Sequence, residues 1–359
     1  MPKVKPTVPS PSLMVWTVND PVIENPGILE EQFHDIRLAG FGGVLVYVRG
    51  SRYSWNDRPA REALRRIGIL CREFSMQYWL GPDPRFVSHE LIPRGRGLEV
   101  IAFGDQTRAN VFPHFAPVED GVFSLRCETP ARHVHTLTDV AIEYYPLGIV
   151  RAFAVSASGE VFDDDTVIDV TKEARFFYNA RDRYVEAFGR FYPPDAGPWK
   201  VIAFFRFSTN HVDFSDRSQM HAYTDMLDRL EREVDTADAM IWDEAGYTCT
   251  YGTLPYAKAI RKRFKKDAGR SLKGSLWKLA LDAADGSHVA VRNHYYRIIQ
   301  ELLNDAQRDA NKHARRLWGK EVVAGIHDTW HFESADMCDM NHGSLDLWEA
   351  LPTKSGGFV

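Results

Sequence analysis

The sequence lacks the features that mark membrane, secreted and disulfide-rich proteins. No apolar run approaches the roughly 20 residues that a membrane helix needs, and the proline-rich stretch 1–12 contains no apolar segment typical of a signal peptide. Its four cysteines, at positions 71, 127, 249 and 338, form no C-x-x-C pair and are too scattered for a disulfide framework. These absences favour a cytoplasmic protein with reduced thiols.

The charged residues give no footprint of a nucleic-acid partner. The net charge is −5, and lysines and arginines are mixed with acidic residues along the chain instead of forming a stripe. We therefore expect neither a nucleic-acid nor a membrane partner. With 359 residues, 44% of them hydrophobic, the chain is long enough for one large core with an insertion or for two domains.

The hydrophobic pattern predicts strands that alternate with helices in the first and last parts of the chain. Strands are expected at the apolar runs 12–18, 42–50, 76–81, 239–244, 321–331 and, more weakly, 344–351. Helices are expected at the amphipathic segments 28–40, 59–74, 216–235, 254–269 and 288–318. Such alternation indicates parallel βαβ units. Because the first βα turn has no G-x-G-x-x-G fingerprint, a (β/α) TIM-type barrel is favoured over a doubly wound sheet.

Between residues 87 and 205 the pattern changes to short apolar or alternating runs, separated by Gly, Pro and Asp clusters. We therefore predict an α/β protein with the first part of a barrel at 1–86, an inserted antiparallel β-domain at 87–205 and the remainder of the barrel at 206–359. A complete barrel has eight strands, and this chain offers five clear ones and a weaker sixth. The barrel is thus expected to be incomplete, or to be closed by a second copy of the chain or by a partner chain.

In a (β/α) barrel, the functional side chains follow the carboxyl ends of the strands. The polar, charged and aromatic residues at these points are Asn19, Asp20, Arg49, Asp83, Asp243, Glu244, His327, Asp328, Trp330 and His331. A carboxylate placed there can act as a general acid or base when burial against aromatic residues, here Trp242 and Tyr247, raises its pKa. A structural role, as a helix cap or in an ion pair, accounts for acidic residues in such loops as readily.

The segment "HDTWH" raises a metal-dependent hydrolase as an alternative. His327 and His331 are four residues apart with Asp328 between them, and Cys338 and His342 follow closely. The two histidines leave a strand, however, and the chain has no H-E-x-x-H helix. Polar contacts to a sugar, or histidines that are hydrogen-bonded within the fold, are the favoured interpretations, and we expect no metal and no other cofactor.

Four segments stand in an order that a known enzyme family shares. They are "VWTVND…LEEQFHDIRLAGFGGVLVYVRG", "PPDAGPWKVIAFF", "HVDFSDRSQMHAYTDMLDRLE" and "MIWDEAGY". Together they resemble large bacterial glycoside hydrolases of the α-L-rhamnosidase type and their uncharacterised relatives, most specifically over 198–247. The resemblance implies a (β/α) barrel with a β-domain inserted after the third strand. It also implies that Glu244 is the catalytic acid/base, that Asp243 orients it or binds sugar, and that Asp20 lies near the substrate.

We therefore expect a carbohydrate-active glycoside hydrolase in which Glu244 protonates the glycosidic oxygen. A second carboxylate would act as nucleophile or as base for water. Asp328 is the candidate for that group, with Asp346 or another polypeptide as alternatives, unless the group is missing. The expected substrate contacts are Asn19, Asp20, Arg49, Asp83, Asp243, Tyr247, His327, Trp330 and His331. Besides the metal-dependent hydrolase, the alternative is a non-catalytic carbohydrate-binding or partner subunit of such an enzyme.

Overall fold

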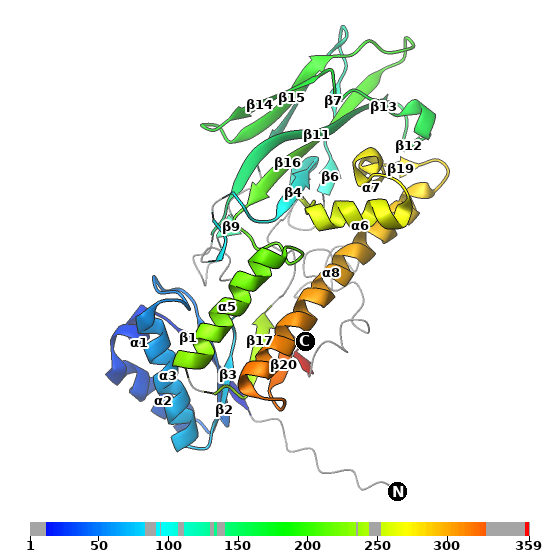
Figure 1. The fold of residues 1–359 in the computed structure, drawn as a ribbon. Helices are drawn as coiled ribbons and strands as arrows, with labels where there is room; N and C mark the ends of the chain where they lie inside the picture. The colour runs from blue at the N-terminus through cyan, green and yellow to red at the C-terminus, as the bar shows by residue number, and fades with distance from the viewer. Residues whose placement is uncertain are drawn as a thin grey trace, which may run out of the picture.

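The computed structural model combines a parallel sheet, a group of antiparallel sheets and a long helix that runs from one to the other (Figure 1). It describes residues 12–82, 91–93, 95–106, 111–129, 133–134, 141–234, 236–243, 253–327 and 356–358. The parallel sheet is built from segments at both ends of the chain, and most of the antiparallel strands come from the middle.

The parallel sheet has six strands in sequential order, each parallel to its neighbours. They are β1 (Leu13–Val18), β2 (Gly43–Val48), β3 (Gln77–Leu80), β17 (Ala239–Asp243), β20 (Val323–His327) and β21 (Gly356–Phe358). All six residues of β2 are buried, as its run of β-branched and aromatic residues leads one to expect of a central parallel strand.

Helices cover one face of this sheet. They are α1 (Asp20–Glu24), α2 (Pro26–Leu38), α3 (Arg58–Glu73) and α5 (Arg217–Glu233). The side chain of Asn25 caps α2 and that of Asp216 caps α5, each by accepting two backbone N–H bonds of the first turn. Apolar residues of the helices and of the facing sheet side join one large core. The other face carries a separate buried cluster of Leu45, Tyr47, Trp79, Ala239 and Ile241.

The predicted TIM-type barrel is wrong. In the described part of the chain the parallel sheet is open, with β1 at one edge and β21 at the other, and the remaining large sheets are antiparallel. Alternating strands and helices identify parallel neighbours, but closure depends on strand number and tilt, which no local pattern records. There is thus no barrel to complete, and the expected homo-oligomer or partner chain stays a prediction. The predicted strand at 344–351 lies outside the described residues.

The antiparallel region consists of two larger sheets and several short pairs (Figure 1). The first sheet has the order β13 (Ile168–Asp169), β11 (Tyr144–Ser156), β16 (Trp199–Thr209), β4 (Glu99–Ala102) and β18 (Leu254–Pro255), and β7 (Ala116–Pro117) also pairs with β16. The second contains β14 (Ala174–Asn179), β15 (Tyr184–Arg190) and β8 (Val122–Glu128). The predicted boundary at residue 205 falls inside β16, and β18 joins this region from the later part of the chain.

The short pairs of strands are β5 (Gly104–Gln106) with β6 (Val111–Pro113), β9 (His133–Val134) with β10 (Ala141–Ile142), and β12 (Val161–Phe162) with β19 (Asp282–Ala283). The first two pairs are antiparallel and the third is parallel. Because β19 follows β18 in the chain, this third pair is a second link between the later part of the chain and the inserted region.

The helix α8 (Ser287–Trp318) connects the two regions. Its 32 residues span about 48 Å at the usual rise per residue. It contacts α6 (Lys258–Ala268) and α7 (Trp277–Ala280) beside the antiparallel strands and α5 beside the parallel sheet, and β20 follows its carboxyl end (Figure 1). Two 3₁₀ turns, η1 (Asp164–Thr166) and η2 (Leu272–Ser275), complete the elements used below. No described helix has an apolar stretch long enough to cross a bilayer.

Candidate functional site

Predicted site residues meet at the carboxyl edge of the parallel sheet. Because all its strands run in one direction, their carboxyl ends lie along the same edge. Asn19 and Asp20 follow β1, and Arg49 follows β2. On the other side of β3, the backbone of Asp243 at the end of β17 pairs in register with that of His327 at the end of β20. Residues that are far apart in the sequence are therefore brought to one edge.

Asn19 presents a buried acceptor at this edge. Its backbone carbonyl starts α1 by accepting hydrogen bonds from the N–H groups of Val22, at 3.1 Å, and Ile23, at 2.9 Å. Its side-chain oxygen Oδ1 is buried, and none of the described residues donates a hydrogen bond to it. A buried acceptor without a donor is costly to folding, so it often marks a place where a ligand or water supplies the donor. A sugar hydroxyl would be such a donor.

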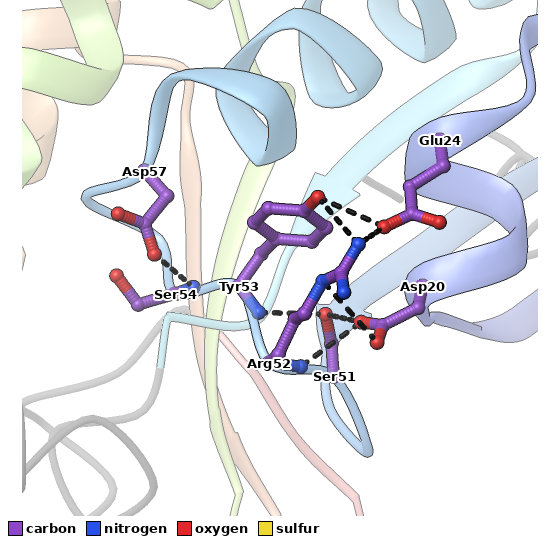
Figure 2. A network of polar contacts seen from close by, with 7 residues as sticks. All are labelled: Asp20, Glu24, Ser51, Arg52, Tyr53, Ser54 and Asp57. Carbon is purple, nitrogen blue, oxygen red and sulfur yellow. Dashed lines mark hydrogen bonds and ion pairs between the residues drawn. The ribbon is translucent and has the colours of Figure 1, made fainter.

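Asp20 holds the loop that follows β2 (Figure 2). Its carboxylate oxygen Oδ1 accepts hydrogen bonds from Ser51 Oγ, at 2.5 Å, and from the Arg52 backbone N–H, at 2.9 Å, and Oδ2 lies 3.8 Å from Arg52 Nε. The hydrogen bond from Ser51 is the main cause that lowers the pKa of Asp20 below its ordinary value. Asp20 is thus ionised and already bonded, which fits a positioning role better than proton transfer.

The same loop is fastened to α1 at a second point (Figure 2). The Arg52 guanidinium donates to Glu24 and, at 3.1 Å, to the hydroxyl of Tyr53, which in turn donates to Glu24 Oε1 at 2.9 Å. These side chains are largely exposed, so the ion pair adds little to stability. Its effect is to order the segment between β2 and α3, which begins with Arg49.

Arg49 is a fixed cation at the edge. Its guanidinium carbon lies 3.9 Å from the centre of the Tyr47 ring, a cation–π contact. The Tyr47 ring in turn lies against Gly81, just after β3, where a Cβ atom would come within 2.1 Å of Tyr47 Cε1. Only glycine leaves room for this ring. The packing therefore holds a positive charge close to where β1, β2 and β3 end.

The ends of β3 and β17 are joined through α5. Trp242 donates its indole N–H to the Tyr223 hydroxyl at 2.8 Å, and that hydroxyl donates to the backbone oxygen of Pro82 at 2.8 Å. Trp242 is buried, and its ring also contacts Phe214. Trp242 is therefore a core residue that anchors the strand end. Its ring contacts Tyr223 and Phe214. The expected contact with the carboxylate of Glu244 falls on a residue outside the described part of the chain, so it stays a prediction.

Asp213 is an acidic residue that sequence reasoning missed as a candidate. It precedes α5 at the end of that helix nearest the carboxyl edge, and its Oδ1 accepts hydrogen bonds from the Ser215 N–H, at 2.9 Å, and hydroxyl, at 2.5 Å. Burial raises the pKa of Asp213 in spite of these bonds. The spacing D-x-S before a helix is typical of a turn, so no local pattern indicated a carboxyl group with a raised pKa.

The remaining predicted site residues cannot be compared with this geometry. Asp83, Glu244, Tyr247, Asp328, Trp330 and His331 lie outside the described residues. For Asp243 and His327, the description covers the backbone pairing alone. Among the residues that are described, no group of three or more His, Cys, Asp or Glu side chains is arranged to hold a metal ion. The metal-dependent alternative involves His327, Asp328 and His331, so it stays untested.

Comparisons of the chain with protein-family models, with curated proteins and with solved structures find no match. The resemblance to α-L-rhamnosidase-type hydrolases therefore stays a prediction from the sequence.

Proposed function

We propose that the protein is a carbohydrate-active hydrolase whose substrate binds at the carboxyl edge of the parallel sheet. The observation that carries the proposal is the parallel arrangement itself. It brings the ends of β1, β2, β17 and β20 to one edge, with Asp243 paired in register with His327 and Glu244 as the next residue. Loops at the carboxyl ends of parallel strands are where α/β proteins bind their ligands.

Two described side chains support a sugar as the ligand. Asn19 offers a buried oxygen that none of the described residues satisfies, and a hydroxyl group is a suitable donor for it. Arg49 offers donors held rigidly on the Tyr47 ring. Asp20 acts indirectly, because its bonds to Ser51 and Arg52 fix the loop that begins with Arg49.

The proposed mechanism is general acid catalysis. Glu244 would give its proton to the glycosidic oxygen as the bond to the sugar breaks. A second carboxylate would either attack the sugar carbon, to form an ester that water then hydrolyses, or take a proton from the water that attacks this carbon directly. Asp328 is the proposed second group. We also propose a cytoplasmic location, since Cys71 is a free buried thiol, as expected in a reducing compartment.

The test is turnover of natural glycosides by the Glu244→Gln variant. Glutamine keeps the shape of the side chain but has no proton to give, so turnover should fall by about 10²-fold or more while thermal stability is kept. Glu73→Gln is the matched control. Glu73 is exposed at the carboxyl end of α3, which precedes β3 and therefore lies at the opposite edge of the sheet.

Natural substrates are needed, because an activated aryl leaving group departs with little help from an acid. Full activity of Glu244→Gln on a natural glycoside would refute the assignment. If the parent protein binds glycosides and hydrolyses none, the alternative of a non-catalytic carbohydrate-binding subunit replaces the hydrolase. Activity that disappears with a chelator would favour the metal-dependent alternative.

A further inference from the structure

A basic pocket lies in the other region of the molecule, between the antiparallel sheet and α6. Its volume is about 430 Å³. It is lined by Ile149 and Val150 of β11, Arg206 of β16, Tyr256 in the segment before α6, the α6 residues Lys258, Arg261, Lys262 and Lys265, and the segment Ser271 to Lys273. In Figure 1, α6 runs beside the ends of β4 and β16 and above α8. Six of these side chains are cationic, and none is acidic.

The α6 side of the pocket is a stripe of positive charge. Lys258, Arg261, Lys262 and Lys265 are spaced i, i+3, i+4 and i+7, which places them on one face of the helix. The opposite face is the buried one and includes Phe264. Like charges at i, i+4 repel each other, and cations in the first turn also oppose the helix dipole. The stripe therefore weakens the helix unless an anion compensates it.

The nearby Glu99 forms ion pairs with arginines of the pocket, whereas Asp216 and Asp169 attract Lys258 and Lys273 only from a longer distance. Glu99 accepts a hydrogen bond from Arg261 at 2.6 Å and lies 3.8 Å from Arg206. In the described part of the chain, no ion pair joins any of four lysines of the pocket to a carboxylate; these are Lys258, Lys262, Lys265 and Lys273. By contrast, Arg263 on a neighbouring face of α6 pairs with Glu301 of α8 at 2.5 Å.

The environment of the pocket lowers the pKa of one of its own lysines. Burial and the neighbouring cations Arg151 and Arg206 lower the pKa of Lys273 below its ordinary value, and Asp169 opposes the effect. Burial is the largest cause, and the two arginines add a positive potential at Lys273. An anion in the pocket would relieve that potential for Lys273 and for the α6 stripe together.

We infer that this pocket binds a small organic molecule that carries two or more phosphate groups. Ammonium groups are compact point charges that bind phosphate oxygens well, and four of them facing one cavity suit an anion with several charges. The volume is within the range of small-molecule sites. The apolar side chains of Ile149 and Leu272 also line the pocket and could contact an uncharged part of the ligand. The inference is independent of the proposed hydrolase.

The test is isothermal titration of the full chain with inorganic tripolyphosphate at low ionic strength, where charge interactions are least screened. Lys265→Gln and Lys262→Gln should each weaken binding by about tenfold, the effect of losing one charge-assisted hydrogen bond. Lys266→Gln is the matched control. It removes the same charge from the next residue of the same helix, which is exposed and does not line the pocket, so it should change the affinity by less than about twofold.

The competing explanations give different results. Citrate distinguishes phosphate from carboxylate chemistry, and it should bind at least about tenfold more weakly than tripolyphosphate if ammonium–phosphate pairs select the ligand. If Lys265→Gln and Lys266→Gln lose the same amount of tripolyphosphate affinity, the anion is attracted to the whole basic helix. That result would overturn the proposal of a binding pocket. Tighter binding of a structured RNA with equal losses in both variants would do the same. Absence of tripolyphosphate binding to the folded parent chain, checked by circular dichroism, would also overturn it.

Discussion

The parallel and the antiparallel regions of this molecule distribute their polar residues in different ways. In the parallel sheet, β2 is buried on both faces, and the described residues Asn19, Asp20 and Arg49 of the predicted site follow the carboxyl ends of β1 and β2. In the antiparallel region, exposed and buried residues alternate along a strand such as β8, and the cationic pocket forms against a sheet and not at a strand end. Strand direction thus decides whether polar groups converge or spread.

The largest difference between the regions should appear when buried tyrosine hydroxyls are removed. Tyr223→Phe leaves both the Trp242 indole N–H and the Pro82 carbonyl without their partner, so the free energy of unfolding should fall by about 3 kcal/mol. Tyr295→Phe, beside the antiparallel region, removes the donor of one carbonyl, that of Pro255, and should cost about 1.5 kcal/mol. Urea unfolding of both variants measures the comparison. Equal losses of unfolding free energy in the two variants would show that the second hydrogen bond of Tyr223, in the Trp242–Tyr223–Pro82 connection, does not add to stability.

A glycine in each region gives the next contrast. Gly81→Ala drives a methyl group into the Tyr47 ring, and the free energy of unfolding should fall by about 2 kcal/mol. Because Tyr47 supports Arg49, binding at the carboxyl edge should weaken as well. Gly274→Ala, in η2 of the other region, meets open space and should change stability by less than about 0.5 kcal/mol. A stable Gly81→Ala variant with unchanged sugar binding would show that the Tyr47–Arg49 stack has no role.

The smallest expected effect is the acid dependence of stability at Asp20. The folded-state pKa of Asp20 lies below its ordinary value of 3.8, so its contribution is complete above that pH. The contribution is lost as the pH falls through the lower, folded-state value. Asp20→Asn should therefore differ from the parent by a constant amount near neutral pH, and the difference should shrink below pH 3.8. Urea midpoints measured across this range are the readout.

Asp213 supplies the control of opposite sign. Burial raises its folded-state pKa above 3.8, so its ionised form destabilises the fold at neutral pH. Protonation as the pH falls through the raised value removes that penalty, and the parent gains stability relative to Asp213→Asn. Slopes of the same sign for Asp20→Asn and Asp213→Asn would contradict the assignment of one lowered and one raised pKa.

The local elements could be predicted from the sequence, and the closure of the sheet could not. The amphipathic segments 28–40, 59–74 and 288–318 correspond within two residues to α2, α3 and α8. The apolar runs 42–50 and 239–244 likewise contain β2 and β17. Periodicity reports which face of a segment is buried. It does not report how many strands pair, and for that reason the barrel prediction failed.

Contacts between distant residues also escaped prediction. Lys278, with a side chain 3% exposed, forms an ion pair at 2.8 Å with Asp164, which is 114 residues away. Nothing in either local segment indicates this pairing. The basic stripe of α6, in contrast, had a sequence signal, since six of the nine residues 258–266 are lysine or arginine. Because acidic and basic residues are mixed over the whole chain, the overall charge did not reveal this local excess of cations. The sequence analysis therefore did not predict the pocket.

The position of β3 beside β17 has a consequence for how the chain folds. The backbone N–H of Tyr78, within β3, bonds to the side chain of Asp238, which immediately precedes β17 and lies 160 residues later in the chain. Closing a flexible loop of that length costs about 4 to 5 kcal/mol of chain entropy. During synthesis, β1 to β3 leave the ribosome early, and the edge of β3 that pairs with β17 stays unpaired until β17 has been synthesised. Formation of the antiparallel sheets in the meantime would shorten the effective loop, so we expect them to fold first and the parallel sheet to be completed in a slow, late step.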